Sequence, residues 1–175
     1  MSQPSISIVL PVYNGEEYLR ASIDSVLSQD MEGWELIIID DGSTDDSAKI
    51  SKEYVAKDQR ISFYQNEKNL NLPRALNRGF ECAKGELLTW HSDDNIMLPH
   101  YLSLLKGYLD QHPDIDFVYA DYQRIDGGDR KLSRVWQRPP EFLPARNYVG
   151  ASFMYRRKLL ETVGGYDETM FLIED

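Results

Sequence analysis

Two pairs of adjacent carboxylates each follow a short apolar segment of the chain. Asp40 and Asp41 end the stretch "LIIIDD", and Asp93 and Asp94 end "LLTWHSDD". Like charges brought close raise each other's pKa unless a cation or a hydrogen-bond donor lies between them, so two such pairs in one site imply a partner. For one pair alone, helix capping by turn-forming residues is the simpler interpretation. Two pairs at the same edge of a sheet disfavour helix capping as the explanation.

A hard divalent cation, Mn²⁺ or Mg²⁺, is a partner that these residue types favour. Such an ion takes oxygen ligands, and it commonly uses one or two protein carboxylates while water and substrate phosphates fill the other positions. Asp93 and Asp94 fit that role. Asp40 and Asp41 are suited instead to accept hydrogen bonds from the ring N–H groups or ribose hydroxyls of a nucleotide. Arg74 is the natural phosphate partner, although a solvated arginine in a first helical turn explains its position equally well.

His91 precedes Asp93 by two residues, which on an extended backbone places both side chains on one face. A His-x-Asp metal site is therefore one interpretation of His91, but a hydrogen-bonded structural histidine is the favoured interpretation. His100 and His112 belong to no acidic constellation that would hold a metal ion, and we interpret both as surface or capping residues.

Alternating strands and helices must position these side chains. β-branched and apolar runs predict strands over residues 5–10, 36–39, 60–65, 87–90 and 116–122. Helix-spaced apolar positions predict helices over residues 15–29, around Ile50 to Val55, over 74–84, and after Pro99, where Leu102, Leu105, Tyr108 and Leu109 turn inward. This alternation predicts an α/β doubly wound sheet, in which ligands bind beyond the carboxyl ends of the strands. The acid pairs and the "YNG" loop after the first strand then frame one crevice.

Local signals refine the helix ends. Asn14 with Glu17, and Ser43 with Asp46, have the spacing of side-chain caps at the starts of the first two helices. Gly85 stands where a left-handed C-terminal cap belongs after the helix over 74–84.

Composition restricts the class of protein. A chain of 175 residues that is 42% hydrophobic suits one globular domain. A net charge of −10 with scattered basic residues disfavours a nucleic-acid binder. Cys82 is the only cysteine, which favours a reducing compartment and a cytoplasmic location. We expect no transmembrane segment, because no apolar run approaches about 18 residues. Phosphate-loop, dinucleotide-binding and serine-hydrolase motifs are absent from the sequence.

Four segments together resemble a known family. "SISIVLPVYNGEEYLRASIDSVLSQ", "WELIIIDDGSTDDS", "NLNLPRALNRGFECAKGELLTWHSDDN" and "GGYDETMFLIED" are similar, in order and approximate spacing, to the signatures of family-2 glycosyltransferases with the GT-A fold. That fold is a Rossmann-like nucleotide-binding fold, with a mainly parallel central sheet flanked by helices. The resemblance covers essentially the whole chain.

The resemblance implies an inverting glycosyltransferase. It would move a sugar from a nucleotide donor, most often a UDP-sugar, to a hydroxyl of a glycan or lipid-linked glycan. Pro11, Tyr13, Asp40 and Asp41 would form the nucleotide pocket, with Tyr13 stacked on the base and Asp41 bound to its ring N–H. Arg74 would contact the diphosphate.

The resemblance also implies a metal site and a catalytic base. Asp93 would contact the ribose and the metal, and Asp94 the metal. Many family members have Asp where this chain has His91, so the first acid of the usual Asp-x-Asp motif is missing. Glu174 and Asp175 match the family's Glu-Asp pair, in which the Asp is the general base.

Because relatives continue beyond that pair, we expect a C-terminally truncated member. Residues 1–121 would be the donor-binding half and 122–175 the incomplete start of the acceptor-side half of a single domain, acting in the cytoplasm or at the cytoplasmic face of the membrane. Two alternatives stay open: a nucleotide-sugar-binding module without catalysis, and a phospho-acceptor receiver domain. The receiver domain is disfavoured because its acid pair should follow the first strand.

Overall fold

The computed structural model describes residues 3–128, 130–145, 149–150 and 152–170. Its elements along the chain are β1 (Ile6–Val12), α1 (Leu19–Leu27), β2 (Trp34–Asp40), α2 (Ser47–Val55), β3 (Ile61–Gln65), α3 (Leu72–Cys82), β4 (Leu87–Trp90), α4 (Tyr101–Gln111), β5 (Phe117–Tyr119), β6 (Tyr122–Ile125), β7 (Lys131–Val135), the 3₁₀ helix η1 (Pro140–Ala145), β8 (Phe153–Arg156) and α5 (Arg157–Val163).

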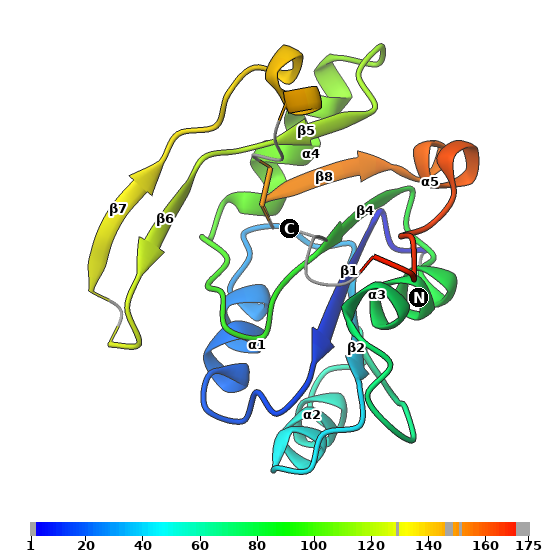
Figure 1. Cartoon of the computed structure of the whole chain (residues 1–175), viewed down its shortest axis with the longest axis vertical. Coiled ribbons are helices and arrows are strands. Elements are labelled where there is room, and N and C mark those ends of the chain that lie inside the picture. Colours follow the sequence, from blue (N-terminus) through cyan, green and yellow to red (C-terminus); the bar gives the residue numbers. More distant parts are fainter. Residues whose placement is uncertain (1–2, 129, 146–148, 151, 171–175) are drawn as a thin grey trace.

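A six-stranded sheet forms the centre of the molecule, in the order β3-β2-β1-β4-β8-β5 (Figure 1). Strands β1 to β4 are parallel to one another, whereas β8 is antiparallel to both β4 and β5. The chain winds outward from β1 to β2 and β3, and then returns to place β4 on the other side of β1. The strand order therefore reverses between β1 and β4, which is where open α/β sheets bind ligands. The predicted, mainly parallel sheet is confirmed.

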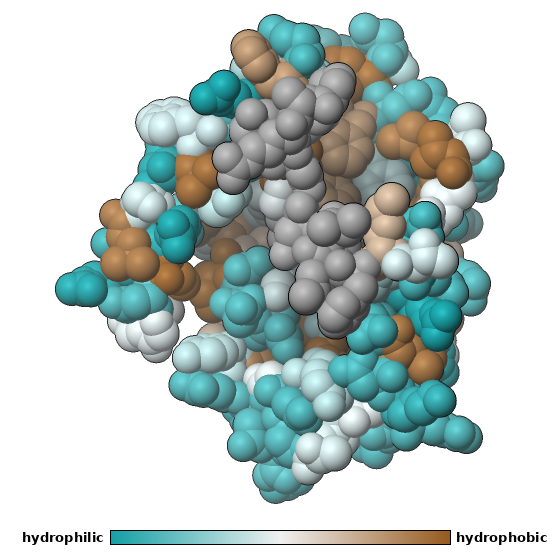
Figure 2. Space-filling view, viewed as in Figure 1, coloured by the Kyte–Doolittle hydropathy of each residue, from teal (hydrophilic) through white to brown (hydrophobic). Residues whose placement is uncertain are grey.

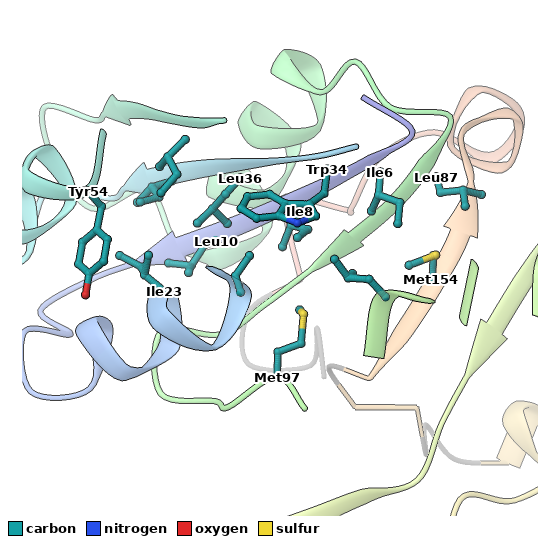
Figure 3. Close-up of a cluster of buried hydrophobic side chains, with 14 of the residues drawn as sticks. Ile6, Ile8, Leu10, Ile23, Trp34, Leu36, Tyr54, Leu87, Met97 and Met154 are labelled. Atoms are coloured by element: carbon teal, nitrogen blue, oxygen red, sulfur yellow. The ribbon is translucent and has the colours of Figure 1, made fainter. Parts of the chain in front are cut away.

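Apolar side chains on both faces of β1 and β2 form two cores, as expected for strands buried on both faces. Ile8 and Leu10 pack with residues of α1, α2 and α4 on one face (Figure 3). Val9 and Ile39 pack with residues of α3 on the other. All seven residues of β1 are buried. Full burial of one such aliphatic side chain is worth about 1.5–3 kcal/mol, so this pair of strands is the rigid support for the loops that follow it.

Three predicted helix ends are wrong. Helix α1 begins at Leu19 and α2 at Ser47, and neither has a side-chain capping bond, so Asn14 and Ser43 are not their caps. Gly85 does not have a left-handed backbone, because α3 ends at Cys82 and the chain continues extended. A Cβ on Gly85 would lie 2.7 Å from the backbone carbonyl carbon of Ile6, so glycine is required there for close approach to β1.

Of the residues expected to face inward on α4, Tyr108 is instead half-exposed.

The region after β5 was predicted least well. Strand β8 inserts between β4 and β5, so the order of the strands in the sheet does not follow their order along the chain. Strands β6 and β7 form a separate antiparallel hairpin that projects from the main sheet at the left of Figure 1.

Candidate functional site

The loops that follow β1, β2 and β4 meet at one edge of the sheet because these parallel strands are neighbours. Val12 ends β1 opposite Asp40, which ends β2. The backbone N–H of Asp41 donates to the Val12 carbonyl over 2.8 Å, and that of His91 donates to the Val9 carbonyl over 2.8 Å. Both acid pairs therefore start from strand ends that are fixed against β1.

A cleft of about 350 Å³ opens at this edge, and Asp41 and Asp93 both line it. Asp94 is exposed beside it. The two acid pairs thus gather at one site, as the sequence predicted. The other lining residues come from the same loops and from the start of α3: Pro11, Val12, Tyr13, Asn69, Asn71, Leu72, Ala75, Trp90 and Ser92.

Asp40 is inaccessible to solvent and does not line the cleft. Its carboxylate accepts hydrogen bonds from the Ser43 backbone N–H at 3.0 Å and from Gln65 Nε2 at 2.7 Å. Both oxygens are thus engaged by the protein. We infer that Asp40 shapes the loop after β2 and does not contact a ligand directly.

Asp41 is also buried, but it faces the cleft. Its Oδ1 accepts from Asn66 Nδ2 at 2.6 Å, and the Leu70 backbone N–H is shared between Oδ1 and Oδ2 at 3.0 Å each. An ionised carboxylate has about four acceptor positions, so Oδ2 keeps the capacity to accept one more hydrogen bond from the cleft. This suits recognition of a ring N–H.

The partners of Asp41 were missed at the sequence level. Asn66 is 6% exposed, and the loop containing it approaches the loop after β2 very closely. Gly42 makes this approach possible, because it has φ +78° and a Cβ there would lie 2.6 Å from the Lys68 carbonyl carbon. The sequence showed only a polar loop ending in Pro73, since no local pattern encodes a contact between separate loops.

A reciprocal set of hydrogen bonds joins the loop after β1 to the loop after β2. The Asn14 N–H donates to Ser43 Oγ at 3.0 Å, and the Thr44 N–H donates to Asn14 Oδ1 at 2.8 Å. The Glu16 N–H donates to Asp45 Oδ2 at 3.0 Å. Asn14 has a left-handed backbone (φ 54°), which asparagine tolerates better than most residues. This loop clasp (Asn14, Glu16, Ser43, Thr44 and Asp45) holds Tyr13, which is half-exposed, next to Asp41.

Asp93 has a perturbed environment on the β4 side of the cleft. Burial, together with the negative charge of Asp94, raises the pKa of its carboxyl to about 6, and the Tyr13 backbone N–H opposes the rise. Ser92 Oγ donates to Asp94 Oδ1 at 2.6 Å. A Cβ on Gly15 would lie 2.1 Å from Asp93 Oδ2, so only glycine at this position leaves room for the carboxylate.

These two carboxylates fit a divalent cation. Two neighbouring acids, one of them shielded from water, are disfavoured as a doubly charged pair until positive charge offsets them. In the described residues no group of three or more His, Cys, Asp or Glu side chains could hold a metal ion. A Mn²⁺ or Mg²⁺ ion commonly uses one or two protein carboxylates and takes its other ligands from water and phosphates.

His91 faces the core and not the cleft. It is 4% exposed, and its Nε2 lies 3.4 Å from Ser25 Oγ on α1. Burial lowers the pKa of its imidazole to about 4, so the ring is neutral at pH 7. The favoured interpretation of a structural histidine is confirmed. His100 and His112 flank α4 at its two ends, as predicted.

The start of α3 borders the cleft, but Arg74 does not line it. Asn71, Leu72 and Ala75 reach the cleft, whereas Arg74 Nε pairs with Glu168 Oε2 at 3.1 Å and both side chains are about half-exposed. The first N–H groups of a helix carry partial positive charge and attract anions. This helix end is therefore a second candidate for phosphate binding, which the sequence analysis did not single out.

The predicted base, Asp175, and its neighbour Glu174 lie outside the described residues. Of the helices that the structure describes, none combines the length and the hydropathy needed to span a membrane.

Comparison with solved structures identifies the fold as GT-A. Staphylococcus aureus TarS, solved in complex with UDP, has a TM-score of 0.79 at 22% identity, covering 94% of this chain and 51% of TarS. The Pyrobaculum calidifontis mannosyltransferase PcManGT, solved with GDP-Man and Mn²⁺, has a TM-score of 0.72 at 18% identity, covering 96% of this chain and 49% of that protein.

The chain belongs to glycosyl transferase family 2, whose model matches residues 7–173. A relative by sequence is the uncharacterized glycosyltransferase MJ1057 of Methanocaldococcus jannaschii, which is 30% identical over 184 residues. All of this chain is covered by that match, but only 63% of the relative. The chain thus spans about half to two-thirds of the length of these proteins.

Proposed function

We propose that this chain binds a nucleoside-diphosphate sugar and transfers its sugar to an acceptor hydroxyl with inversion. The proposed donor is a UDP-sugar. The observation that carries the proposal is the shared cleft at the strand-order reversal, lined by Asp41 from one acid pair and Asp93 from the other. Solved proteins of this fold support it, since TarS binds UDP and PcManGT binds GDP-Man with Mn²⁺.

In this proposal the first two loops recognise the nucleoside. Tyr13 stacks on the base, and Asp41 accepts a hydrogen bond from the ring N–H through Oδ2. Pro11 forms the floor beside it, and Asp40 keeps the loop after β2 in position through Ser43. The loop clasp fixes the separation between the stacking and the hydrogen-bonding side chains, which reduces the ordering cost of binding.

The β4 side of the cleft would receive the diphosphate. Asp93 and Asp94 would hold Mn²⁺ or Mg²⁺, and Asp93 would also contact the ribose. Such an ion, when bound, stabilises the negative charge of the departing diphosphate. The N-terminal end of α3, which also borders the cleft, would add a partial positive charge, and Arg74 would contact the phosphates once it leaves Glu168.

Asp175 is proposed as the general base. It would take the proton from the acceptor hydroxyl while the oxygen attacks the anomeric carbon from the face opposite the nucleotide. A single displacement inverts the anomer. The acceptor would be a glycan or a lipid-linked glycan, and the single cysteine supports a reducing, cytoplasmic place of action.

The test is a thermal-shift panel of UDP, GDP, CDP and dTDP, each with and without Mn²⁺. Ligand at about 100 times its Kd stabilises the folded state by roughly 2.7 kcal/mol, and we expect UDP with Mn²⁺ to give the largest shift. Asp94→Ala should abolish that shift. The matched control is Asp114→Ala, an exposed aspartate between α4 and β5 that is remote from the cleft. An unchanged shift in Asp94→Ala would remove the metal role from the acid pair.

Turnover separates the enzyme from a binding module that has no catalysis. We expect Asp175→Asn to eliminate sugar transfer while the shift with UDP and Mn²⁺ persists. Equal turnover in the wild type and the variant would show that Asp175 is not the base.

A further inference from the structure

The β6–β7 hairpin differs in charge from the rest of the chain. Residues 122–138 carry five basic and two acidic side chains, a net charge of +3, in a chain whose net charge is −10. Asp126 pairs with Arg130 and Asp121 pairs with Arg134, whereas in the described part of the chain Arg124 and Lys131 form no ion pair. The hairpin is thus a basic projection on an acidic body.

Most side chains of the two hairpin strands are exposed. In β7, every residue from Lys131 to Arg134 is exposed, and Val135 is half-buried. An isolated two-stranded hairpin is marginally stable at best in water, so contacts with the rest of the chain must support this one. In Figure 2, hydrophobic atoms lie among hydrophilic ones over this part of the molecule, at the left of the view.

One row of the hairpin combines apolar, cationic and aromatic groups. Leu132, Arg134 and Trp136 alternate along the strand and share a face. Leu132 is 51% and Trp136 68% exposed, and the guanidinium of Arg134 lies 4.0 Å from the Trp136 ring centroid. We call these three residues the hairpin row.

Contacts with the body show which face of the hairpin is turned inward. Tyr122 pairs with Val135 on the face opposite the hairpin row, and a Cβ on Gly150 would lie 3.2 Å from the Tyr122 ring. At the turn, a Cβ on Gly127 would lie 3.0 Å from Tyr18 Oη. The body therefore supports one face and the tip, and the hairpin row points outward.

We propose that the hairpin row docks this protein on an anionic lipid surface. Tryptophan and the long stems of arginine and lysine have an apolar body and a polar end, which suits the boundary between headgroups and acyl chains. The negative leaflet attracts the basic projection and repels the acidic body, so the hairpin meets the membrane first. The hairpin row combines a cationic, an aromatic and an apolar side chain, a combination that matches the charge and the polarity of an anionic headgroup layer.

Tryptophan fluorescence tests the proposal directly. Trp34 and Trp90 are buried, so an emission shift on adding vesicles reports on Trp136. We expect a blue shift and co-sedimentation with phosphatidylcholine vesicles that contain phosphatidylglycerol, and neither with phosphatidylcholine alone. The binding should weaken in about 1 M salt, where the Debye length is about 3 Å.

Variants distinguish the hairpin row from the rest of the surface. We expect Arg134→Glu and Leu132→Ser each to weaken partitioning about tenfold or more, because one removes a basic side chain from the hairpin row and the other an apolar side chain. The matched controls are Lys57→Glu at the end of α2 and Leu104→Ser on α4, where Leu104 is 68% exposed. Both controls should bind vesicles like the wild type, and all four should keep the thermal shift with UDP and Mn²⁺.

Four outcomes would overturn the proposal. The first two are no binding to anionic vesicles and equal binding to neutral vesicles. The third is an equal emission shift with soluble glycerol 1-phosphate, which would mean that no surface is needed. The fourth is an emission shift that rises with protein concentration in the absence of vesicles, which would indicate that a second copy binds the hairpin row. Loss of UDP binding with vesicle binding intact would remove the proposed function alone.

Discussion

The edge of the main sheet and the β6–β7 hairpin both present charged side chains, but they support them in different ways. At the sheet edge, Asp40 and Asp41 follow a buried strand, and their oxygens accept hydrogen bonds from at least two other segments. On the hairpin, Arg134 and Lys131 stand on a ribbon without its own core. The acids at the sheet edge are thus held in place by other segments, as the proposed binding of a small ligand requires, whereas the hairpin side chains are exposed, as the proposed contact with a lipid surface requires.

The largest effect should come from placing a charge in the core beneath the site. We expect His91→Asp to lower the free energy of unfolding by about 3–5 kcal/mol in urea titrations, because an unpaired carboxylate would be buried against α1. Gln123→Asp on the exposed β6 strand is the hairpin counterpart and should stay within about 0.5 kcal/mol. A small loss for His91→Asp together with tighter Mn²⁺ binding would show that residue 91 faces the metal.

A smaller effect should follow from filling the space beside Asp93. Gly15→Ala places a methyl group on the Asp93 carboxylate, and overpacking of this kind costs about 1–3 kcal/mol. We also expect the thermal shift with UDP and Mn²⁺ to shrink, because the carboxylate must move. Gly128→Ala in the hairpin turn, where the nearest atom would be 3.6 Å away, should change neither quantity. A normal nucleotide shift in Gly15→Ala would mean that Asp93 tolerates displacement.

The smallest effect should come from ion pairs. The Arg60 guanidinium beside Asp58 holds the pKa of that carboxyl below its usual range, and the pair is mostly shielded from solvent at 2.7 Å. Because the folded-state pKa is lowered, the stabilisation is present above the unfolded pKa of about 3.9 and is lost as the pH falls through the folded value. Asp58→Asn should therefore cost up to about 1 kcal/mol at pH 7 and progressively less below pH 4.

The hairpin provides the comparison for this pair. Backbone N–H groups of Arg130 and Gly128 lower the pKa of Asp126, so the sign of the pH dependence is the same. The Asp126–Arg130 pair is more exposed, and Asp126→Asn should cost less than Asp58→Asn at every pH. Equal losses in urea titrations would show that the hairpin is as tightly packed as the segment before β3.

The sequence by itself determined the strand and helix alternation and the gathering of both acid pairs at one edge. Buried strands such as "SISIVL" and helix-spaced leucines are local signals, and the edge follows from them because parallel strands end on the same side. The helix caps at Asn14 and Ser43 were predicted from spacing alone and were wrong, because each residue bonds to the other loop and not to its own helix.

The tertiary structure alone decided how the site is held together. Asn66 against Asp41, Gly15 against Asp93, Glu168 beside Arg74 and the insertion of β8 between β4 and β5 all join segments that are distant along the chain. Periodicity and capping patterns describe each segment by itself, so they contain no information about such pairs. Those contacts form only when packing of the two cores fixes the loops in space, and for that physical reason they could not be read from the residues.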